Sequence, residues 1–169
     1  MAMQISGVTI QGGMNIQPAG GSPSPSGGGF QGSNYGYTAG GDASGGPSAA
    51  DVIDKFSFVS DANATDVGDL ATNARQTSGQ SSSVSGYTSG GDINPGKINV
   101  IQKFSFTSDG NATDVGDLLE SINAPAGQSS GDNGYIAGGD GASYTTVIQK
   151  FPFASDGNTT NVGNLTQAR

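Results

Sequence analysis

The chain of 169 residues contains no cysteine, no histidine and no tryptophan. The lack of cysteine excludes disulfides and thiolate zinc sites, and the lack of histidine removes the commonest transition-metal ligand and general base. Basic residues are scarce as well, because six lysines and arginines stand against fourteen acidic residues and leave a net charge of −8. A surface with this charge disfavours nucleic acid and anionic lipid as partners.

Long apolar runs and good helix formers are also in short supply. Thirty glycines and seven prolines disfavour regular helix, which excludes a helical bundle. No run approaches the roughly 18 apolar residues of a membrane-spanning helix. Residues 1–13 lack the basic start and the apolar centre of a signal peptide. We therefore expect that the chain does not insert into a membrane and that it assembles in the cytoplasm.

What the chain does contain is an internal repeat of about 50 residues. The motif Gly-Tyr-x-x-Gly-Gly-Asp begins at Gly36, Gly86 and Gly134. The motif Val-Ile-x-Lys-Phe-x-Phe, which holds six of the seven phenylalanines, follows at residues 52–58, 100–106 and 147–153. Turn-rich stretches ending in Val-Gly-Asp-Leu or Val-Gly-Asn-Leu occupy residues 60–70, 108–118 and 155–165. A fixed period of this length predicts a repeat architecture.

Each repeat predicts four short strands. They are a Gln/Ser-rich segment such as residues 79–84, the Gly-Tyr segment, the Phe-x-Phe segment and a short strand that ends at the leucine. Pro152 cannot donate to a strand ladder, so we expect an irregular strand in the third repeat. The prediction is an all-β domain over residues 30–169, with repeats at about 30–75, 76–122 and 123–169.

The residues before the repeats predict a separate segment. With Gln11-Gly12-Gly13 as a three-residue loop, a β-hairpin over residues 1–17 gathers four apolar side chains on one face, those of Val8, Ile10, Met14 and Ile16. Residues 18–29 form a flexible linker rich in Gly, Pro and Ser. Because an isolated hairpin is marginal in water, we interpret this one as an anchor. A strand that merely completes the assembly, or a frayed terminus, is the alternative.

Three turns space oxygen ligands as calcium loops do, and their first carboxylates are Asp61, Asp109 and Asp156. No bidentate glutamate follows them, and tight turns need the same Asp, Asn and Gly residues, so turn chemistry is favoured over calcium. The repeated Asp42, Asp92 and Asp140 and the repeated Lys55, Lys103 and Lys150 are interpreted as structural groups. We assign no catalytic residue and no cofactor.

Residues outside the repeat pattern are better candidates for specific recognition, because function concentrates in variable loops on a rigid scaffold. The candidate ligand-contacting residues are Tyr35, Asn94, Lys97 and Tyr144. The tyrosines of the repeat itself are expected to pack in the core between sheets, and they are Tyr37, Tyr87 and Tyr135.

Gly40-Gly41, Phe56-x-Phe58, Leu70 and Ala74-Arg75 stand in the order that is typical of a kelch repeat. The chain therefore resembles the kelch-type β-propeller repeats, although it has no tryptophan and carries Ile122-Asn123 in place of Ala-Arg. The Lys-Phe-x-Phe and Thr-Asp-Val-Gly-Asp-Leu segments are similar to those of short kelch-like repeat virion proteins of marine bacteriophages. The resemblance implies three four-stranded blades per chain.

Three blades do not close a propeller, since closed propellers have typically four to eight. Two copies would close a six-bladed ring, so a homodimer is expected, with a three-sheet prism or a linear stack as alternatives. The resemblance implies a non-enzymatic structural protein of a phage virion, in capsid decoration or a tail fibre, bound to other virion proteins through its amino terminus. The alternative function is a carbohydrate-binding adhesin module that recognises host surface glycans.

Overall fold

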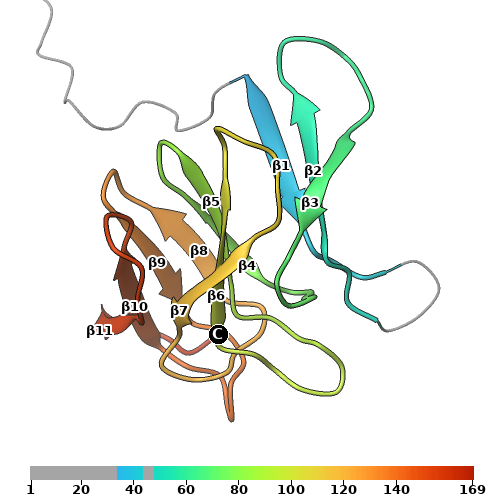
Figure 1. Ribbon diagram of the computed structural model, residues 1–169. Helices are drawn as coiled ribbons and strands as arrows, with labels where there is room; N and C mark the ends of the chain where they lie inside the picture. Colours follow the sequence, from blue (N-terminus) through green and yellow to red (C-terminus); the bar gives the residue numbers. More distant parts are fainter. Residues whose placement is uncertain (1–33, 44–47) are drawn as a thin grey trace, which may run out of the picture.

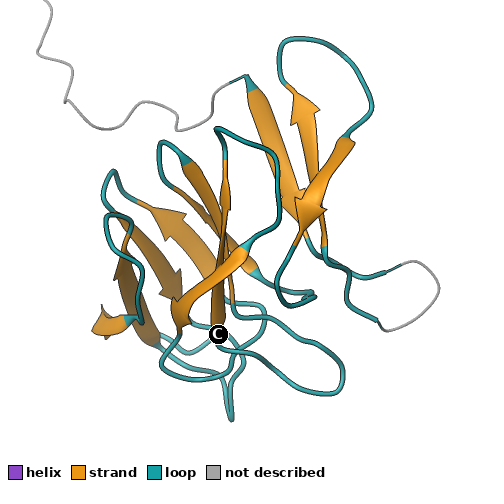
Figure 2. Ribbon diagram, in the orientation of Figure 1, coloured by secondary structure: helices purple, strands orange, loops and turns teal. Residues whose placement is uncertain are grey.

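The computed structural model describes residues 34–43 and 48–169, which form eleven β-strands in three antiparallel sheets (Figure 1, Figure 2). These ranges contain no helix, and the prediction of an all-β domain is confirmed. The predicted anchor residues Val8, Ile10, Met14 and Ile16 and the predicted linker at 18–29 lie outside the described residues.

The strands follow the repeat, one sheet for each copy. The first sheet has the order β1-β2-β3, with β1 Tyr35–Ala39, β2 Val52–Ser57 and β3 Thr65–Asp69. The second has the order β4-β5-β6-β7, with β4 Ser78–Ser81, β5 Ser85–Ser89, β6 Val100–Ser105 and β7 Thr113–Asp117. The third has the order β8-β9-β10-β11, with β8 Ala126–Ser129, β9 Asn133–Ala137, β10 Val147–Pro152 and β11 Thr160–Asn164.

Two expectations about individual strands need correction. The strand predicted at 79–84 ends at Ser81, because Ser82 turns the chain by donating its backbone N–H to Ser85 O over 2.9 Å. Pro152 does not disturb its strand, since it is the last residue of β10 and pairs with Asn133 in an unbroken register. Among the described residues the first sheet has three strands rather than four.

The Gly-Tyr motif is explained by packing across neighbouring strands. Gly86 in β5 lies opposite Phe104 in β6, and a Cβ atom at position 86 would lie 2.3 Å from the phenylalanine ring. Gly36 and Gly134 have the same relation to Phe56 and Phe151. An aromatic ring that covers a glycine fixes the strand register, which explains why these two motifs recur together.

The three sheets lie side by side like successive blades, with β4 and β8 in contact (Figure 1). Their hydrophobic core lies between the sheets. One cluster joins the second and third sheets and comprises Tyr87, Ile101, Leu118, Ile122, Ile136 and Phe151. The other joins the first and second sheets and comprises Ile53, Leu70, Phe104 and Ala112. Each sheet is therefore stabilised mainly by its neighbours, as in repeat proteins.

Candidate functional site

The contacts between neighbouring sheets are the best-defined polar features of the molecule. We call the contact between the first and second sheets the first joint, and that between the second and third sheets the second joint. The ring of Tyr37 stacks on Phe106 at 4.8 Å in the first joint, and Tyr87 stacks on Phe153 at 5.0 Å in the second. Burial raises the pKa of Tyr87 above its ordinary value. Packing of Tyr37 and Tyr87 between sheets is thus confirmed.

The backbones of adjacent sheets approach one another closely at each joint. A Cβ atom at Gly116 would lie 2.3 Å from Gly157 O, and one at Gly68 would lie 2.4 Å from Gly110 O. Any larger residue at these two positions would therefore push the sheets apart. This close approach explains the glycine of the Val-Gly-Asp-Leu motif.

Asparagine side chains connect the backbones across this approach. Asn111 Oδ1 accepts a hydrogen bond from Asp69 N over 3.1 Å in the first joint. Asn158 Oδ1 accepts one from Asp117 N over 3.0 Å in the second. The backbone carbonyl oxygens of Asp69 and Asp117 in turn accept hydrogen bonds of 2.8 Å from backbone N–H groups of the following sheet. The Asp/Asn-rich turns are thus used to join sheets.

Two buried glutamines reinforce the joints. Gln102 is 1% exposed, and its amide accepts a hydrogen bond from Thr72 N over 2.8 Å and donates one to Thr72 O over 2.9 Å. Gln149, also 1% exposed, accepts from Leu119 N over 2.8 Å. Each glutamine follows a register shift in its strand, a bulge that redirects the side chain. The first sheet carries Asp54 at this point.

Two of the three aspartates of the calcium-like turns form ion pairs at the joints. Lys55 Nζ lies 2.9 Å from Asp109 Oδ1, and Lys103 Nζ lies 3.0 Å from Asp156 Oδ1. These hydrogen bonds raise the pKa of both lysines above the ordinary value. Within residues 34–43 and 48–169 no group of three acidic side chains is placed to hold a metal ion.

The Gly-Gly-Asp motifs directly follow β1, β5 and β9. They lie at the opposite end of the strands from the lysine–aspartate pairs. Arg75 bridges two of them, with Nη1 2.7 Å from Asp42 Oδ1 and Nε 3.3 Å from Asp92 Oδ1. The hydrogen bond to Asp42 raises the pKa of Arg75. Lys97 Nζ lies 3.0 Å from Asp140 Oδ2 and donates to Gly141 O over 2.7 Å. The repeated aspartates are thus engaged in contacts between repeats.

The structure brings only some of the candidate ligand-contacting residues together. Lys97 and Tyr144 both lie beside Asp140, and Tyr144 is 67% exposed. Asn94 lies in the same loop as Lys97 and donates its N–H to Asp92 Oδ1. Tyr35 stands apart, because it begins β1 rather than lying in a loop, and its ring lies 4.7 Å from Lys55 Nζ. The four residues therefore do not form one site.

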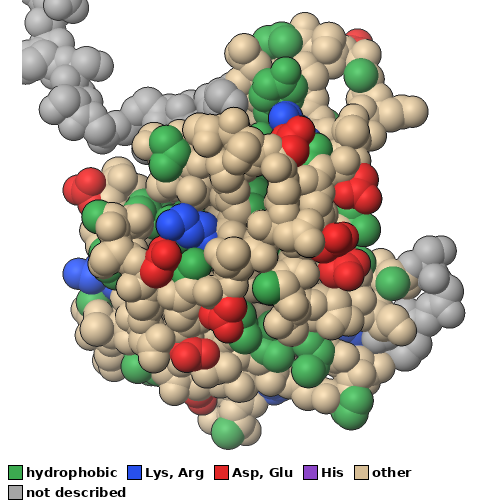
Figure 3. Space-filling model, viewed as in Figure 1, with side chains coloured by type: hydrophobic (Ala, Val, Ile, Leu, Met, Phe, Trp, Pro, Cys, Tyr) green, Lys and Arg blue, Asp and Glu red, His purple; other side chains and the backbone are tan. Residues whose placement is uncertain are grey.

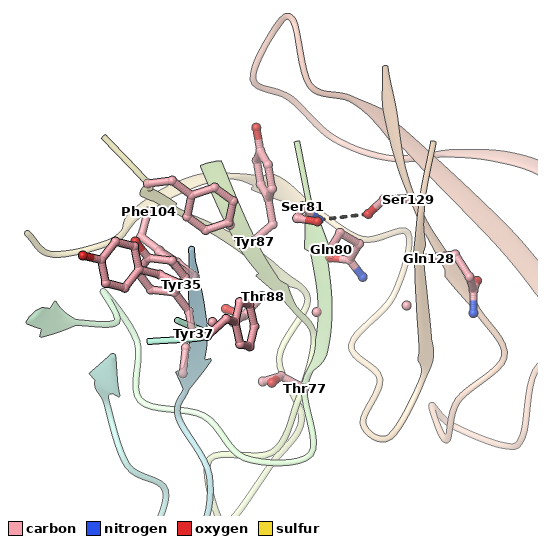
Figure 4. Close-up of a pocket in the computed structure, with 17 residues that line it drawn as sticks. Tyr35, Tyr37, Thr77, Gln80, Ser81, Tyr87, Thr88, Phe104, Gln128 and Ser129 are labelled. Atoms are coloured by element: carbon pink, nitrogen blue, oxygen red, sulfur yellow. Dashed lines mark hydrogen bonds between the residues drawn. The ribbon is translucent and has the colours of Figure 1, made fainter. Parts of the chain in front are cut away.

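A cavity of about 600 Å³ lies at the inner end of the first joint (Figure 4). Tyr37 and Phe104 contribute apolar walls, and Gln80, Ser81 and Ser129 come from the inner strands β4 and β8. Thr88, a residue that is 6% exposed, also lines the cavity, and its buried hydroxyl has no hydrogen-bond partner among the described residues. Tyr35 is the one candidate ligand-contacting residue that reaches this cavity.

On the face in Figure 3 the acidic side chains are scattered rather than gathered, and basic side chains are few. The part of the chain that the structure describes contains no helix able to cross a lipid bilayer.

Sequence reasoning missed the residues that join the sheets. Gln102 and Gln149 are polar residues inside otherwise apolar strands, and this pattern could have identified them. Asn111 and Asn158 lie in the calcium-like turns and recur at one position of the repeat, a second pattern that points to them.

Neither a scan against protein-family models nor a search of curated proteins gave a match for this chain. What the protein does is therefore inferred from its own contacts.

Proposed function

We propose that the chain is a non-enzymatic structural protein that assembles head to tail, two copies closing a six-bladed ring, and that a virion displays it through its amino-terminal residues. One observation carries the assembly: the two open ends of the three-sheet arc present the two complementary halves of a joint. The virion is supported by the sequence resemblance to phage repeat proteins.

The ion pairs illustrate this complementarity. At each joint a lysine pairs with an aspartate of the following sheet, as Lys55 does with Asp109 and Lys103 with Asp156. The next lysine in the series, Lys150, makes no ion pair with any described residue, and neither does Asp61 at the other end of the arc. A second copy placed head to tail would bring Lys150 against Asp61.

The close backbone approach follows the same series. Gly68 and Gly116 each face the backbone of the next sheet, whereas a Cβ atom at Gly163 would meet nothing within 4 Å. Asn164 corresponds to Asp69 and Asp117, and Asn63 corresponds to the bridging Asn111 and Asn158. The third sheet thus offers the glycine face, and the first sheet offers the asparagine turn.

Head-to-tail contacts build a closed ring when the rotation between copies closes and an open filament when it does not. With three sheets per chain, two copies give six blades, which lies within the usual range of propellers. Four of the repeated aspartates form ion pairs between repeats, which supports a structural rather than an enzymatic role, and they are Asp92, Asp109, Asp140 and Asp156.

Light scattering of the purified full chain tests the assembly. The expected mass is twice that of the chain, with and without residues 1–27. Gly163→Val places a side chain in the contact and should give monomers that keep the β-sheet circular dichroism of the native chain. A monomeric, trimeric or filamentous native chain would contradict the six-bladed ring.

A charge exchange sharpens the test. Lys150→Glu and Asp61→Lys should each weaken the dimer, because each puts like charges together, and the double variant should recover part of the affinity. The matched control exchanges Asp132, which lines a pocket between the second and third sheets rather than an open end of the arc, for Lys. If the control weakens the dimer as much as Asp61→Lys does, the proposed contact is wrong.

Display on a virion is tested on purified particles. The protein should be found in them by mass spectrometry, and deletion of residues 1–27 should remove it from the particles while leaving its mass in solution unchanged. If the deletion leaves it on the particles, the amino-terminal anchor is wrong.

Recognition of host glycans is the second candidate function, and the position of Tyr35 favours it. Tyr35 is 43% exposed and lines the cavity, where an aromatic ring can stack on a sugar. On a glycan array the chain should then bind defined oligosaccharides, and Tyr35→Ala should abolish binding while Tyr144→Ala should not.

A further inference from the structure

The inner strand is what distinguishes the second joint from the first. In the second joint β8 lies against β4, Ser81 N donates to Ser129 Oγ over 2.9 Å, and a Cβ atom at Gly127 would lie 2.5 Å from Gly79 O. The first joint lacks such a contact among the described residues. A Cβ atom at Gly79 would meet nothing within 4 Å. In the second joint the corresponding glycine, Gly127 of β8, is covered by β4, so we expect an equivalent strand of the first sheet to cover β4.

The cavity occupies the place where the corresponding strand of the first sheet would lie. In the other two sheets the equivalents of β1 are β5 and β9. One edge of these strands pairs with β6 or β10, and the other edge pairs with β4 or β8. On β1 this edge borders the cavity, whose lining includes Tyr35, Tyr37 and Ala39. Its volume of about 600 Å³ is within the range that accommodates a short peptide segment.

The residues that line the cavity favour an added strand that carries one apolar side chain. Tyr37 and Phe104 are apolar walls, whereas the buried Thr88 hydroxyl lacks a hydrogen-bond partner. The hydroxyl is already shut off from solvent, so what an added strand would cover is the apolar surface beside it. In the second joint the corresponding position is Ile136, which is fully buried.

The spacing of the repeat identifies the occupant. β4 begins seven residues before β5, and β8 begins seven residues before β9. The same spacing before Tyr35 selects residues 28–31, Gly-Gly-Phe-Gln, which lie outside the described residues. We propose that residues 28–31 add to β1 as the innermost strand of the first sheet, with the ring of Phe30 in the cavity.

The side-chain directions agree with this register. Phe30 corresponds to Gln80, whose amide points toward the third sheet and donates to Tyr135 O over 3.5 Å. Phe30 therefore points toward the second sheet, where Thr88 and Phe104 line the cavity. It is also the only phenylalanine outside the Phe-x-Phe motifs. Gly29 corresponds to Gly79 and Gly127, so the glycine of the inner strand is kept in all three repeats.

This strand fixes where the amino-terminal residues leave the domain. Residue 28 lies opposite Ala39, as Ser78 lies opposite Ser89 and Ala126 opposite Ala137. The preceding residues then leave beside Gly40-Gly41-Asp42, at the end of the blades where Arg75 bridges two aspartates. The inference does not depend on the proposed dimer.

An engineered disulfide tests the register in the full chain, which contains no cysteine of its own. Directly opposite residues have Cβ atoms about 5 Å apart, close to disulfide geometry. The double variant Gly28→Cys/Ala39→Cys should form an intramolecular disulfide in most molecules. In the control Gly29→Cys/Ala39→Cys the side chain at 29 points to the other face, and few molecules should be linked. Free thiols and mass are measured on the denatured protein.

Three results would overturn the proposal. Equal linkage in both variants would mean that residues 28–31 have no fixed register, and no linkage in either would mean that they lie elsewhere. A covalent dimer from Gly28→Cys/Ala39→Cys would mean that a second copy supplies the strand.

The ring of Phe30 is tested separately. Phe30→Ala should lower Tm by roughly 10 °C, as expected for loss of a buried phenylalanine, and Phe30→Leu should recover most of the loss. Met14→Ala, a truncation of another apolar residue outside the described part, should leave Tm unchanged. A Phe30→Ala protein with the Tm of the native chain would show that the ring is not buried in the cavity.

Discussion

The first and second joints have the same outer contacts and differ at their inner ends. Both have a stacked tyrosine, a bridging asparagine and a lysine–aspartate pair. At the inner end, the second joint buries Ile136 completely, whereas the first has the cavity and the unpartnered Thr88 hydroxyl. The comparison shows that the outer contacts align two sheets and that the inner strand fills the space between them.

The largest expected effect comes from breaking the second joint with Gly116→Ala. The new Cβ atom would overlap Gly157 O, and the positive φ of 157° at Gly116 is unfavourable for alanine. We expect a loss of about 4 kcal/mol in the free energy of unfolding, measured by urea denaturation. Gly163→Ala has nearly the same φ of 156° and no overlap within the chain, so below the concentration at which the chain dimerises it should cost about 1 kcal/mol. Equal losses would mean that the close approach is not what requires glycine.

Exchanging the inner-end residues sharpens the comparison. Ile136→Thr should cost about 3 kcal/mol, because it removes buried apolar atoms and places a hydroxyl in the core. Thr88→Ile, the reverse change in the first joint, should alter the free energy of unfolding by less than about 1 kcal/mol, since it removes a buried hydroxyl that has no hydrogen-bond partner among the described residues. Thermal and urea unfolding of both variants measure this difference. Similar costs would show that the inner ends are alike.

The buried glutamine of the first joint comes next in size. Gln102→Leu should cost about 2 kcal/mol, because Thr72 N and Thr72 O lose their partners while the residue stays buried. Asp54→Leu is the matched control at the same position of the first sheet. Asp54 makes no such contact with a described residue, so stability measured below the dimer concentration should change little. A Gln102→Leu protein as stable as the native chain would contradict the role of the glutamine in the joint.

Alkaline pH should have the smallest effect. The pKa values of Tyr87 and Lys103 are raised in the folded chain, Tyr87 mainly by burial and Lys103 mainly by its hydrogen bond to Asp156. A group with a raised folded pKa contributes stability that is present below its unfolded pKa and is lost as pH rises through the folded pKa. Tm should therefore fall by a few degrees above about pH 10. The fall in Tm above about pH 10 should be smaller in Lys103→Met than in the native chain. If Tm falls equally in both proteins, the ion pair is not the source of the fall.

The sequence was sufficient to predict the all-β class and the repeat. Alternating β-branched and aromatic residues specify strands such as β6, and the period of glycines and phenylalanines shows which strands correspond. The repeated lysines are interpreted from the sequence as structural groups, and Lys55 and Lys103 both make ion pairs between sheets. These features depend on local pattern and on composition, which one sequence contains.

The partners across the joints could not be predicted. Whether Asn111 caps its own turn or reaches Asp69 N depends on how far one sheet is rotated from the next, and no local pattern encodes that rotation. The same holds for Gln102, whose direction follows from a bulge. The candidate recognition residues were chosen because they vary between repeats, which gave no information on whether Tyr35 and Tyr144 lie together.

The chain of joints also determines how the protein should unfold. The middle sheet is held by two joints and each outer sheet by one, so amide hydrogen exchange should be slowest in β5 and β6 and faster toward both ends of the arc. Ring closure would remove this gradient, because every sheet would then have two neighbours. The protein would change from a molecule that opens progressively from its ends to one that opens cooperatively.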